Sequence, residues 1–183
     1  WEGWLWVLDR TTLAPLQTIS FSTGSYPTSI AADSRSGAFY VGDMYRNRIL
    51  VLKPDPAGQL AVSSAITGVG SPYDIVLDTG SNRLYCAGGG YNFVYMVDIL
   101  TGKAVKTIQG GYYPFRLAID RARGVMYAAN YYSNDISVYG LNTVILQTTI
   151  DIRRYEPYDI ALLPDPDKAL ITSRMTSGMF VWN

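Results

Sequence analysis

The segment PYDIVLDTGSNRLYCAGGGYNFVYMVDILTGKAVKTI, from Pro72 to Ile108, decides the fold because the chain repeats its pattern four times. The copies begin at four prolines that are 45, 42 and 43 residues apart. Fixed positions in the copies carry the same residue types, the proline and the aliphatic residue in all four copies and the aspartate, tyrosine and asparagine in the first three. These are proline itself (Pro27, Pro72, Pro114, Pro157), an aliphatic residue (Ile30, Ile75, Leu117, Ile160), aspartate (Asp33, Asp78, Asp120), tyrosine (Tyr40, Tyr85, Tyr127) and asparagine (Asn47, Asn92, Asn134). A period in the low forties is typical of repeats that each form one small sheet.

Each copy predicts four short strands separated by turns. In the second copy they are Tyr73–Asp78, Arg83–Ala87, Phe93–Asp98 and Ala104–Ile108. The third strand is apolar at successive residues, so both of its faces must be covered. Sheets stacked face to face around an axis provide that cover. The sequence therefore predicts an all-β fold, a β-propeller of four-stranded antiparallel blades.

The two ends of the chain complete the blade count. Residues 1–21 align with the last two strands of a copy, and residues 152–183 with the first three. Between them lie full repeats at 22–66, 67–109 and 110–151. Seventeen strands do not divide into fours. We expect one propeller domain over 1–183 with about four blades, interpreted as an arc or fragment of a larger ring because strands that start at residue 1 and finish at the last residue are typical of a truncated ring. A closed four-bladed ring with Trp1–Asp9 left over is the alternative.

The composition of the chain restricts which classes of function and which cellular locations are expected. Fifteen basic and fifteen acidic residues give a net charge of zero, which makes a nucleic-acid groove an unfavoured interpretation. The single Cys86 lies in an apolar run and is expected to be a buried, inert thiol. The sequence has no apolar run long enough to span a membrane. The chain begins without methionine, so either a leader has been removed or the chain is part of something longer.

Several runs resemble known repeats of this architecture. PTSIAADSRSGAFYVGDMYRNRILVL (27–52) is similar to NHL repeats and to the YVTN repeats of bacterial and archaeal cell-surface propellers. LYCAGGGYNFVYMVD and MYAANYYSNDISVYG resemble the YVTN type. The resemblance implies an exported protein, located at the cell surface, outside the cell or in the periplasm. It implies little about activity, because such propellers include binding modules, surface-layer components, lactonases, lyases and subunits of redox enzymes.

Residues that recur in every copy are interpreted as structural. An aspartate at the end of a strand, as at Asp33, Asp78 and Asp120, can accept hydrogen bonds from the amides of its own turn. The asparagines before the third strand receive the same interpretation. Gly88–Gly90 are expected to form a loop that allows close approach of backbone, because no strand–loop–helix pattern of a phosphate loop surrounds them.

Function is sought where the copies differ. The loops before each proline, and those between the second and third strands, fall on one face and are rich in tyrosine and arginine. Such side chains are frequent at recognition surfaces. The predicted binding residues are Tyr45, Arg46, Tyr91, Tyr113, Tyr131, Tyr132, Arg154, Tyr155 and Arg174. The alternative is that these tyrosines only cover the edges of the blades.

Catalysis has little support in the sequence. The chain has no histidine, so triads and histidine-ligated metals are excluded. Carboxylates at Asp43, Asp135, Glu156 and Asp159 leave a calcium site or an acid–base pair open, but no metal or cofactor is predicted. We expect a non-catalytic module for binding or assembly, with a protein partner, self-assembly through the edges at Trp4–Leu8 and Met179–Trp182, or a small ligand. The alternative is part of a larger propeller enzyme whose reactive residues lie outside this chain.

Overall fold

The computed structural model describes residues 2–152, 155–163, 168–174 and 179–182. All of its sheets are antiparallel, and three of them have four strands. The first of these contains β3 (Pro27–Asp33), β4 (Ala38–Asp43), β5 (Arg48–Pro54) and β6 (Leu60–Ile66). The second contains β7 (Pro72–Asp78), β8 (Arg83–Gly88), β9 (Phe93–Asp98) and β10 (Lys103–Gln109), and the third β11 (Pro114–Asp120), β12 (Val125–Asn130), β13 (Asp135–Gly140) and β14 (Leu146–Asp151). The expected all-β fold is confirmed.

Two smaller sheets lie at the ends of the described chain. β1 (Trp4–Leu8) pairs with β2 (Pro15–Ser20), and β15 (Pro157–Leu162) and β17 (Met179–Trp182) flank β16 (Ala169–Ser173). Leu5 opposes Ile19 and Leu8 opposes Pro15, as Val94 opposes Ile108 and Val97 opposes Ala104 in the second full sheet. The opening pair therefore has the same register as the third and fourth strands of a full sheet.

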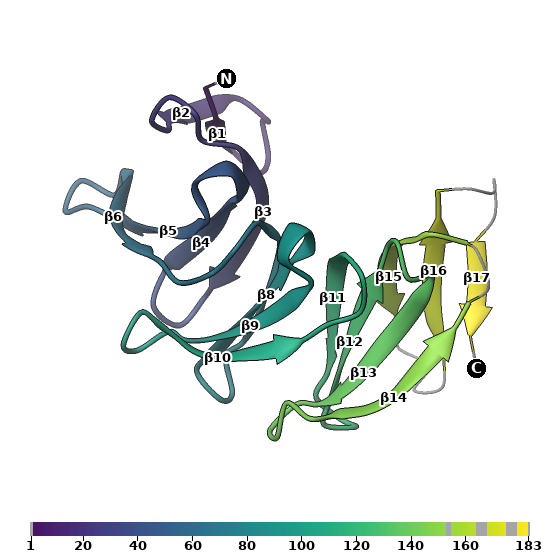
Figure 1. Ribbon diagram of the computed structural model, residues 1–183. Helices are drawn as coiled ribbons and strands as arrows, with labels where there is room; N and C mark the ends of the chain where they lie inside the picture. The colour runs from purple at the N-terminus through teal and green to yellow at the C-terminus, as the bar shows by residue number, and fades with distance from the viewer. Residues whose placement is uncertain (1, 153–154, 164–167, 175–178, 183) are drawn as a thin grey trace.

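The sheets are arranged as consecutive blades with their first strands innermost. β3 contacts β7, β7 contacts β11, and β11 contacts β15, although each belongs to a different sheet. Figure 1 shows the sheets following one another along an open arc, with the first and last sheets at opposite ends. The geometry is that of propeller blades, and it places the segments around each repeated proline close together.

Packing between blades buries the third strands on both faces. One core cluster joins the first and second full blades through Ile49, Val51, Tyr95 and Val97, and a second joins the next pair through Val94 and Tyr139. Successive residues of β9 thus enter different cores, which explains the unbroken apolar run. Cys86 is fully buried in the first cluster, and burial raises the pKa of its thiol, as expected for an unreactive side chain.

The repeated aspartates stabilise turns, and the repeated asparagines stabilise the connections between blades, which we call joints. Asp33 Oδ1 accepts the Arg35 N–H, Asp78 Oδ1 that of Gly80, and Asp120 Oδ1 that of Arg123. The asparagines act between blades. Asn47, Asn92 and Asn134 adopt positive φ, and their Oδ1 atoms accept the N–H groups of Ser71, Tyr113 and Glu156 at 2.7, 2.9 and 3.0 Å.

Each residue that donates its N–H to this joint directly precedes the proline of the next blade, and each also has positive φ. Asparagine tolerates this conformation better than most residues and supplies the acceptor in the same position. The structural interpretation of these asparagines is confirmed, and it extends to the connection between repeats.

The loops between second and third strands contain short 3₁₀ turns, at Met44–Arg46 and Gly89–Tyr91, where the sequence predicted only loops. A Cβ at Gly88 would lie 2.6 Å from the Gly70 carbonyl oxygen, so the close backbone approach expected there is present. Within the described residues, no helix has the length and apolar character needed to cross a membrane.

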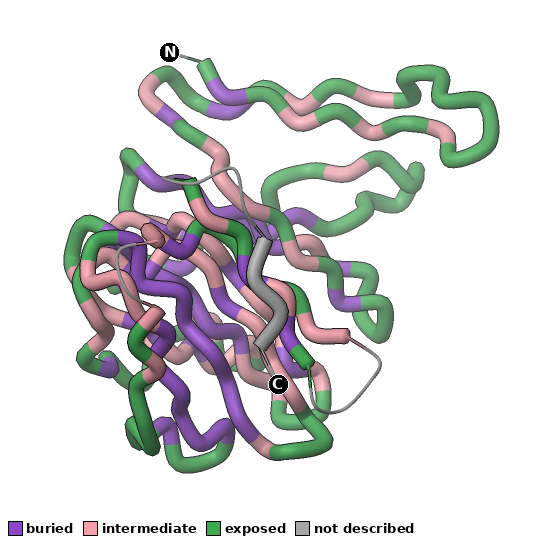
Figure 2. The backbone as a smooth tube through the Cα atoms, turned by 90° about the vertical axis from the view of Figure 1, so that its right-hand side faces the viewer, coloured by how far each residue is buried: buried purple, intermediate pink, exposed green. Residues whose placement is uncertain are grey.

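The hairpin of β1 and β2 projects from one end of the molecule, as Figure 2 shows. Trp4, Trp6 and Leu8 alternate along β1 and are exposed. In the described chain β1 pairs with β2 alone, and β17 pairs with β16 alone. These are the two edges for which the sequence suggests strand addition.

Candidate functional site

A bulge at the start of each innermost strand directs one side chain out of the regular pattern. Pro72 opposes Gly88 and Asp74 opposes Ala87, so Tyr73 is the extra residue. The same shift recurs in the other three blades. The extra residues are Thr28, Tyr73, Phe115 and Tyr158. Bulges redirect side chains at sheet edges and near functional sites, and here they bring three aromatic rings to the inner strands of adjacent blades.

These rings form a continuous cluster with tyrosines from the loops. The centroid of Tyr73 lies 5.2 Å from that of Tyr113 and 5.1 Å from that of Phe115. Phe115 in turn lies 4.8 Å from Tyr158, and Tyr131 lies 4.8 Å from Tyr132. We call this set the aromatic cluster; its members are Tyr73, Tyr112, Tyr113, Phe115, Tyr131, Tyr132 and Tyr158.

The aromatic cluster has a buried base and an exposed rim. Tyr131 is 8% exposed, and Tyr113 is half-buried with its hydroxyl hydrogen-bonded to that of Tyr73. Burial raises the pKa of Tyr113, and the Tyr73 hydroxyl adds to the effect. Tyr112, Tyr132 and Tyr158 are exposed. The base fixes the rim in place, which leaves large rigid surfaces facing solvent.

Charged groups lie beside the aromatic cluster on the same inner strands. The Arg116 guanidinium sits 4.6 Å from the centroid of Phe115, and its Nε is 4.0 Å from Asp159 Oδ1. Asp74 accepts the Leu117 N–H of the next blade at 2.9 Å. Burial raises the pKa of Asp74, while the Leu117 hydrogen bond and Arg116 oppose the rise. Arg174 donates to the Tyr131 hydroxyl at 3.1 Å.

The structure brings four of the predicted binding residues together. Tyr113, Tyr131 and Tyr132 belong to the aromatic cluster, and Arg174 contacts it. Tyr91 is exposed and lies toward the first full blade, with its hydroxyl 3.4 Å from Asn47 Nδ2. Tyr155 is half-buried, and its carbonyl accepts the Ser173 hydroxyl. Arg154 lies outside the described residues.

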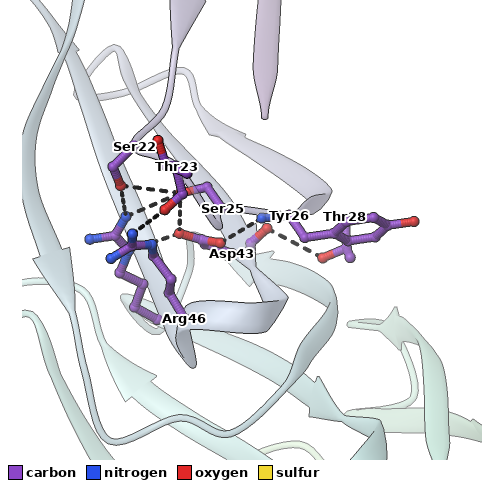
Figure 3. Close-up of polar contacts among 9 residues, drawn as sticks. Ser22, Thr23, Ser25, Tyr26, Thr28, Asp43 and Arg46 are labelled. Carbon is purple, nitrogen blue, oxygen red and sulfur yellow. Dashed lines mark hydrogen bonds and ion pairs between the residues drawn. The ribbon is translucent and has the colours of Figure 1, made fainter. Parts of the chain in front are cut away.

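Tyr45 and Arg46 lie at a separate set of polar contacts around Asp43, which we call the polar hub. The ring of Tyr45 is 4.8 Å from that of Tyr26, and Figure 3 shows Arg46 directed to the Thr23 carbonyl. The centre of the hub is Asp43, which is 1% exposed. Its oxygens accept the Ser25 hydroxyl at 3.0 Å and the Tyr26 N–H at 2.9 Å, and they pair with Arg48 Nε at 2.8 Å. Asp43 thus fixes the loop that leads into β3.

The sequence interpretation missed Tyr73, Phe115, Tyr158 and Arg116. A signal was available, because an aromatic residue directly follows the proline in three of the four copies. It was overlooked because this position was interpreted as the regular start of a strand. The bulge that turns the side chain becomes visible only in the pairing of the strands.

The carboxylates considered for calcium or acid–base chemistry are not gathered in one place. Asp43 is paired with Arg48 in the first full blade, and Asp135 accepts an N–H of Asn130 within the third. Asp159 lies beside Arg116. Over the described part of the chain, no three acidic or thiol side chains are grouped as metal ligands would be.

The fold and this site define an arc of propeller blades with an aromatic cluster over its inner strands. A chain of hydrazine synthase from Kuenenia stuttgartiensis is similar in structure, with a TM-score of 0.72 and 18% sequence identity. The match covers 82% of this chain and 42% of that one, so the present chain spans less than half of its structural relative. At that identity the similarity concerns the fold. No known family matches the sequence, and no curated protein matches it.

Proposed function

We propose that this chain is a non-catalytic binding module that recognises an extended segment of a protein partner through its aromatic cluster. The observation that carries the proposal is the unbroken series of ring contacts across three blades, with a buried base and an exposed rim. Tyrosine provides large contact area with few rotatable bonds, so little entropy is lost on binding. Aromatic-lined surfaces are also the usual docking sites for extended peptides.

The arginines support the same proposal. Arg116 and Arg174 lie over the rings of Phe115 and Tyr131, which holds their guanidinium groups close to the rim. There they can donate to the carbonyl groups of an extended chain. The resemblance of short runs in the repeats to YVTN and NHL repeats supports the further proposal that the module belongs to an exported or surface-exposed protein.

The proposal is tested by selecting phage-displayed random dodecapeptides on the protein. The enriched peptides are then measured against a Tyr112→Ala/Tyr132→Ala/Tyr158→Ala variant, which removes exposed rings and leaves the base intact. The matched control is Leu13→Ala/Leu100→Ala, because both leucines are exposed and lie in turns away from the cluster. We expect loss of binding in the tyrosine variant and retention in the control. Enriched peptides that bind both variants equally would contradict the proposal.

A further inference from the structure

The three interfaces between each full blade and the blade that precedes it differ at two equivalent positions of the third strand. The first residue of the third strand is Arg48 in the first full blade, Phe93 in the second and Asp135 in the third. The residue two places further on faces the same interface, and it is Leu50, Tyr95 and Ser137 respectively. The third blade thus has the smaller side chain at both positions.

A cleft opens where these side chains are small. It has a volume of about 320 Å³ and lies between the second and third full blades, lined by Ile108–Gly111 from one blade and Asp135, Ser137, Tyr139, Leu146 and Thr149 from the other. At the preceding interface, the corresponding hollow is lined on the second blade by Gly102–Thr107 and does not reach β9. The cleft in front of the third blade therefore extends inward to the third strand, and its size suits a small organic molecule better than a single metal ion.

The inner end of the cleft is lined by the Asp135 carboxylate and the Ser137 hydroxyl, and both contact the buried Asn130 amide. Asn130 is 0% exposed, and its Nδ2 donates to Asp135 Oδ1 at 2.6 Å and to Ser137 Oγ at 2.8 Å. Its Oδ1 is buried and has no hydrogen-bond partner among the described residues. The amide also lies against Gly111, because a Cβ there would be 2.5 Å from Asn130 Cγ. Asn130 is not part of the lining of the cleft, but its Nδ2 holds Asp135 and Ser137, which are.

The first full blade shows which group occupies this place. There Asp43 stands at the position of Asn130 and Arg48 at that of Asp135, and the Arg48 guanidinium fills the interface. Its Nε contacts Asp43 Oδ2 at 2.8 Å, and its Nη2 contacts Ser22 Oγ and Ser25 Oγ at 3.2 and 3.4 Å. Ser22 and Ser25 correspond in the repeat to Gln109 and Tyr112, which flank the glycines that line the cleft.

Charge at the cleft also favours a cation. Asp135 brings a carboxylate to the lining of the cleft. Lys106 projects from β10 of the facing blade, and its Nζ donates to the Thr143 carbonyl, so it is held at the turn after β13. Ile108 and Leu146 supply apolar walls beside the acceptors. A flat cation with N–H donors on an aliphatic stem matches both features.

We propose that this cleft binds a guanidinium group carried on an aliphatic stem, with the Asp135 carboxylate and the Ser137 hydroxyl as its acceptors. The group occupies the space that Arg48 fills from within the chain in the first full blade. The source is a small alkylguanidine or an arginine side chain of a partner. This site is distinct from the aromatic cluster, and the proposal does not depend on the peptide recognition proposed above.

Calorimetric titration with n-butylguanidinium tests the proposal, with n-butylurea as a neutral probe of the same shape. We expect heat of binding with the cation and none with the urea. Asp135→Asn should weaken binding by about tenfold or more, because it replaces a charge-assisted contact with a neutral one. Asp135→Arg should abolish binding, because it places an internal guanidinium in the cleft. The control Asp55→Asn removes a carboxylate from an exposed turn and should leave the affinity unchanged.

Four outcomes would overturn the proposal. The first is no binding of the cation to the folded protein, and the second is equal binding of cation and urea. The third is unchanged affinity in Asp135→Asn when circular dichroism shows a native fold. The fourth is stabilisation by Ca²⁺ that Asp135→Asn removes, without any effect of the guanidinium. Tyr158→Ala separates the two proposals, since it should weaken peptide binding and leave the guanidinium affinity unchanged. An Arg-containing peptide that binds through Asp135 identifies a partner as the source.

Discussion

The joint between blades gives a prediction that separates a hydrogen bond from a backbone preference. Asn92 has φ of 60°, and its Oδ1 accepts the Tyr113 N–H at 2.9 Å. Asn92→Gly retains the conformation and removes the acceptor. Loss of one hydrogen bond to a partly buried N–H, together with the flexibility of glycine in the unfolded chain, should destabilise the protein by about 1–2 kcal/mol.

Asn92→Ala removes the same acceptor and leaves a Cβ in the left-handed region without the polar side chain that lets asparagine tolerate this conformation. That conformation is unfavourable by about 1–2 kcal/mol for alanine, so we expect a total loss of roughly 2–3 kcal/mol. The free energy of unfolding falls by about 2 kcal/mol for each molar increase in urea, so the urea concentration at the midpoint of unfolding should fall by about 1 M. The near-ultraviolet circular dichroism of the Asn92→Ala variant should also decrease, because Tyr113 belongs to the aromatic cluster.

The control is Asn82, which also has positive φ, 55°, but whose side chain accepts an exposed bond from Arg35. Asn82→Gly should change stability by less than about 0.5 kcal/mol. Urea unfolding followed by circular dichroism measures all three variants. The reasoning is refuted if Asn92→Gly is as stable as the original protein, or if the glycine and alanine variants at position 92 are equally destabilised.

Two further predictions concern the hydrogen bonds of single side chains. Tyr85 is buried, and its hydroxyl donates to the Leu141 carbonyl of the next blade at 2.9 Å. Tyr85→Phe should therefore lower the free energy of unfolding, measured by urea titration, by about 1–2 kcal/mol. An unchanged midpoint of unfolding would contradict this prediction. The Arg123 N–H bond lowers the pKa of Asp120, so its stabilising contribution is present above the ordinary pKa and is lost as pH falls below 3.8. The stability difference between the original protein and Asp120→Asn should therefore shrink in that acid range, and a difference independent of pH would exclude the Arg123 hydrogen bond as its cause.

Much of the architecture could be predicted from the sequence. Proline spacing, the apolar third strands and the recurring turn aspartates each follow from local chemistry, because a strand apolar on both faces has to be covered on both. The predicted all-β fold of four-stranded antiparallel blades is confirmed by the pairing. The asparagine joints were recognised as structural from their recurrence alone.

The candidate site was predicted less completely. Tyr113, Tyr131 and Tyr132 lie in loops where the copies differ, so the sequence predicts them as binding residues, whereas Tyr73, Phe115 and Tyr158 occupy a repeated position that the pattern assigns to a regular strand. Their side chains gather because a one-residue bulge changes their direction, and that depends on pairing with the neighbouring strand. A bulge of this kind leaves no clear local signature in the chain.

By itself, the sequence determined the repeat, the strands within it and the way in which blades must stack, because these depend on residue type at fixed spacing. The tertiary structure alone decided which differences between repeats meet in space. Asp135, Ser137 and Gly111 are ordinary residues along the chain, yet they open a cleft because they face one another across two blades. Distances between such residues are set by the packing of whole sheets, which no local pattern records.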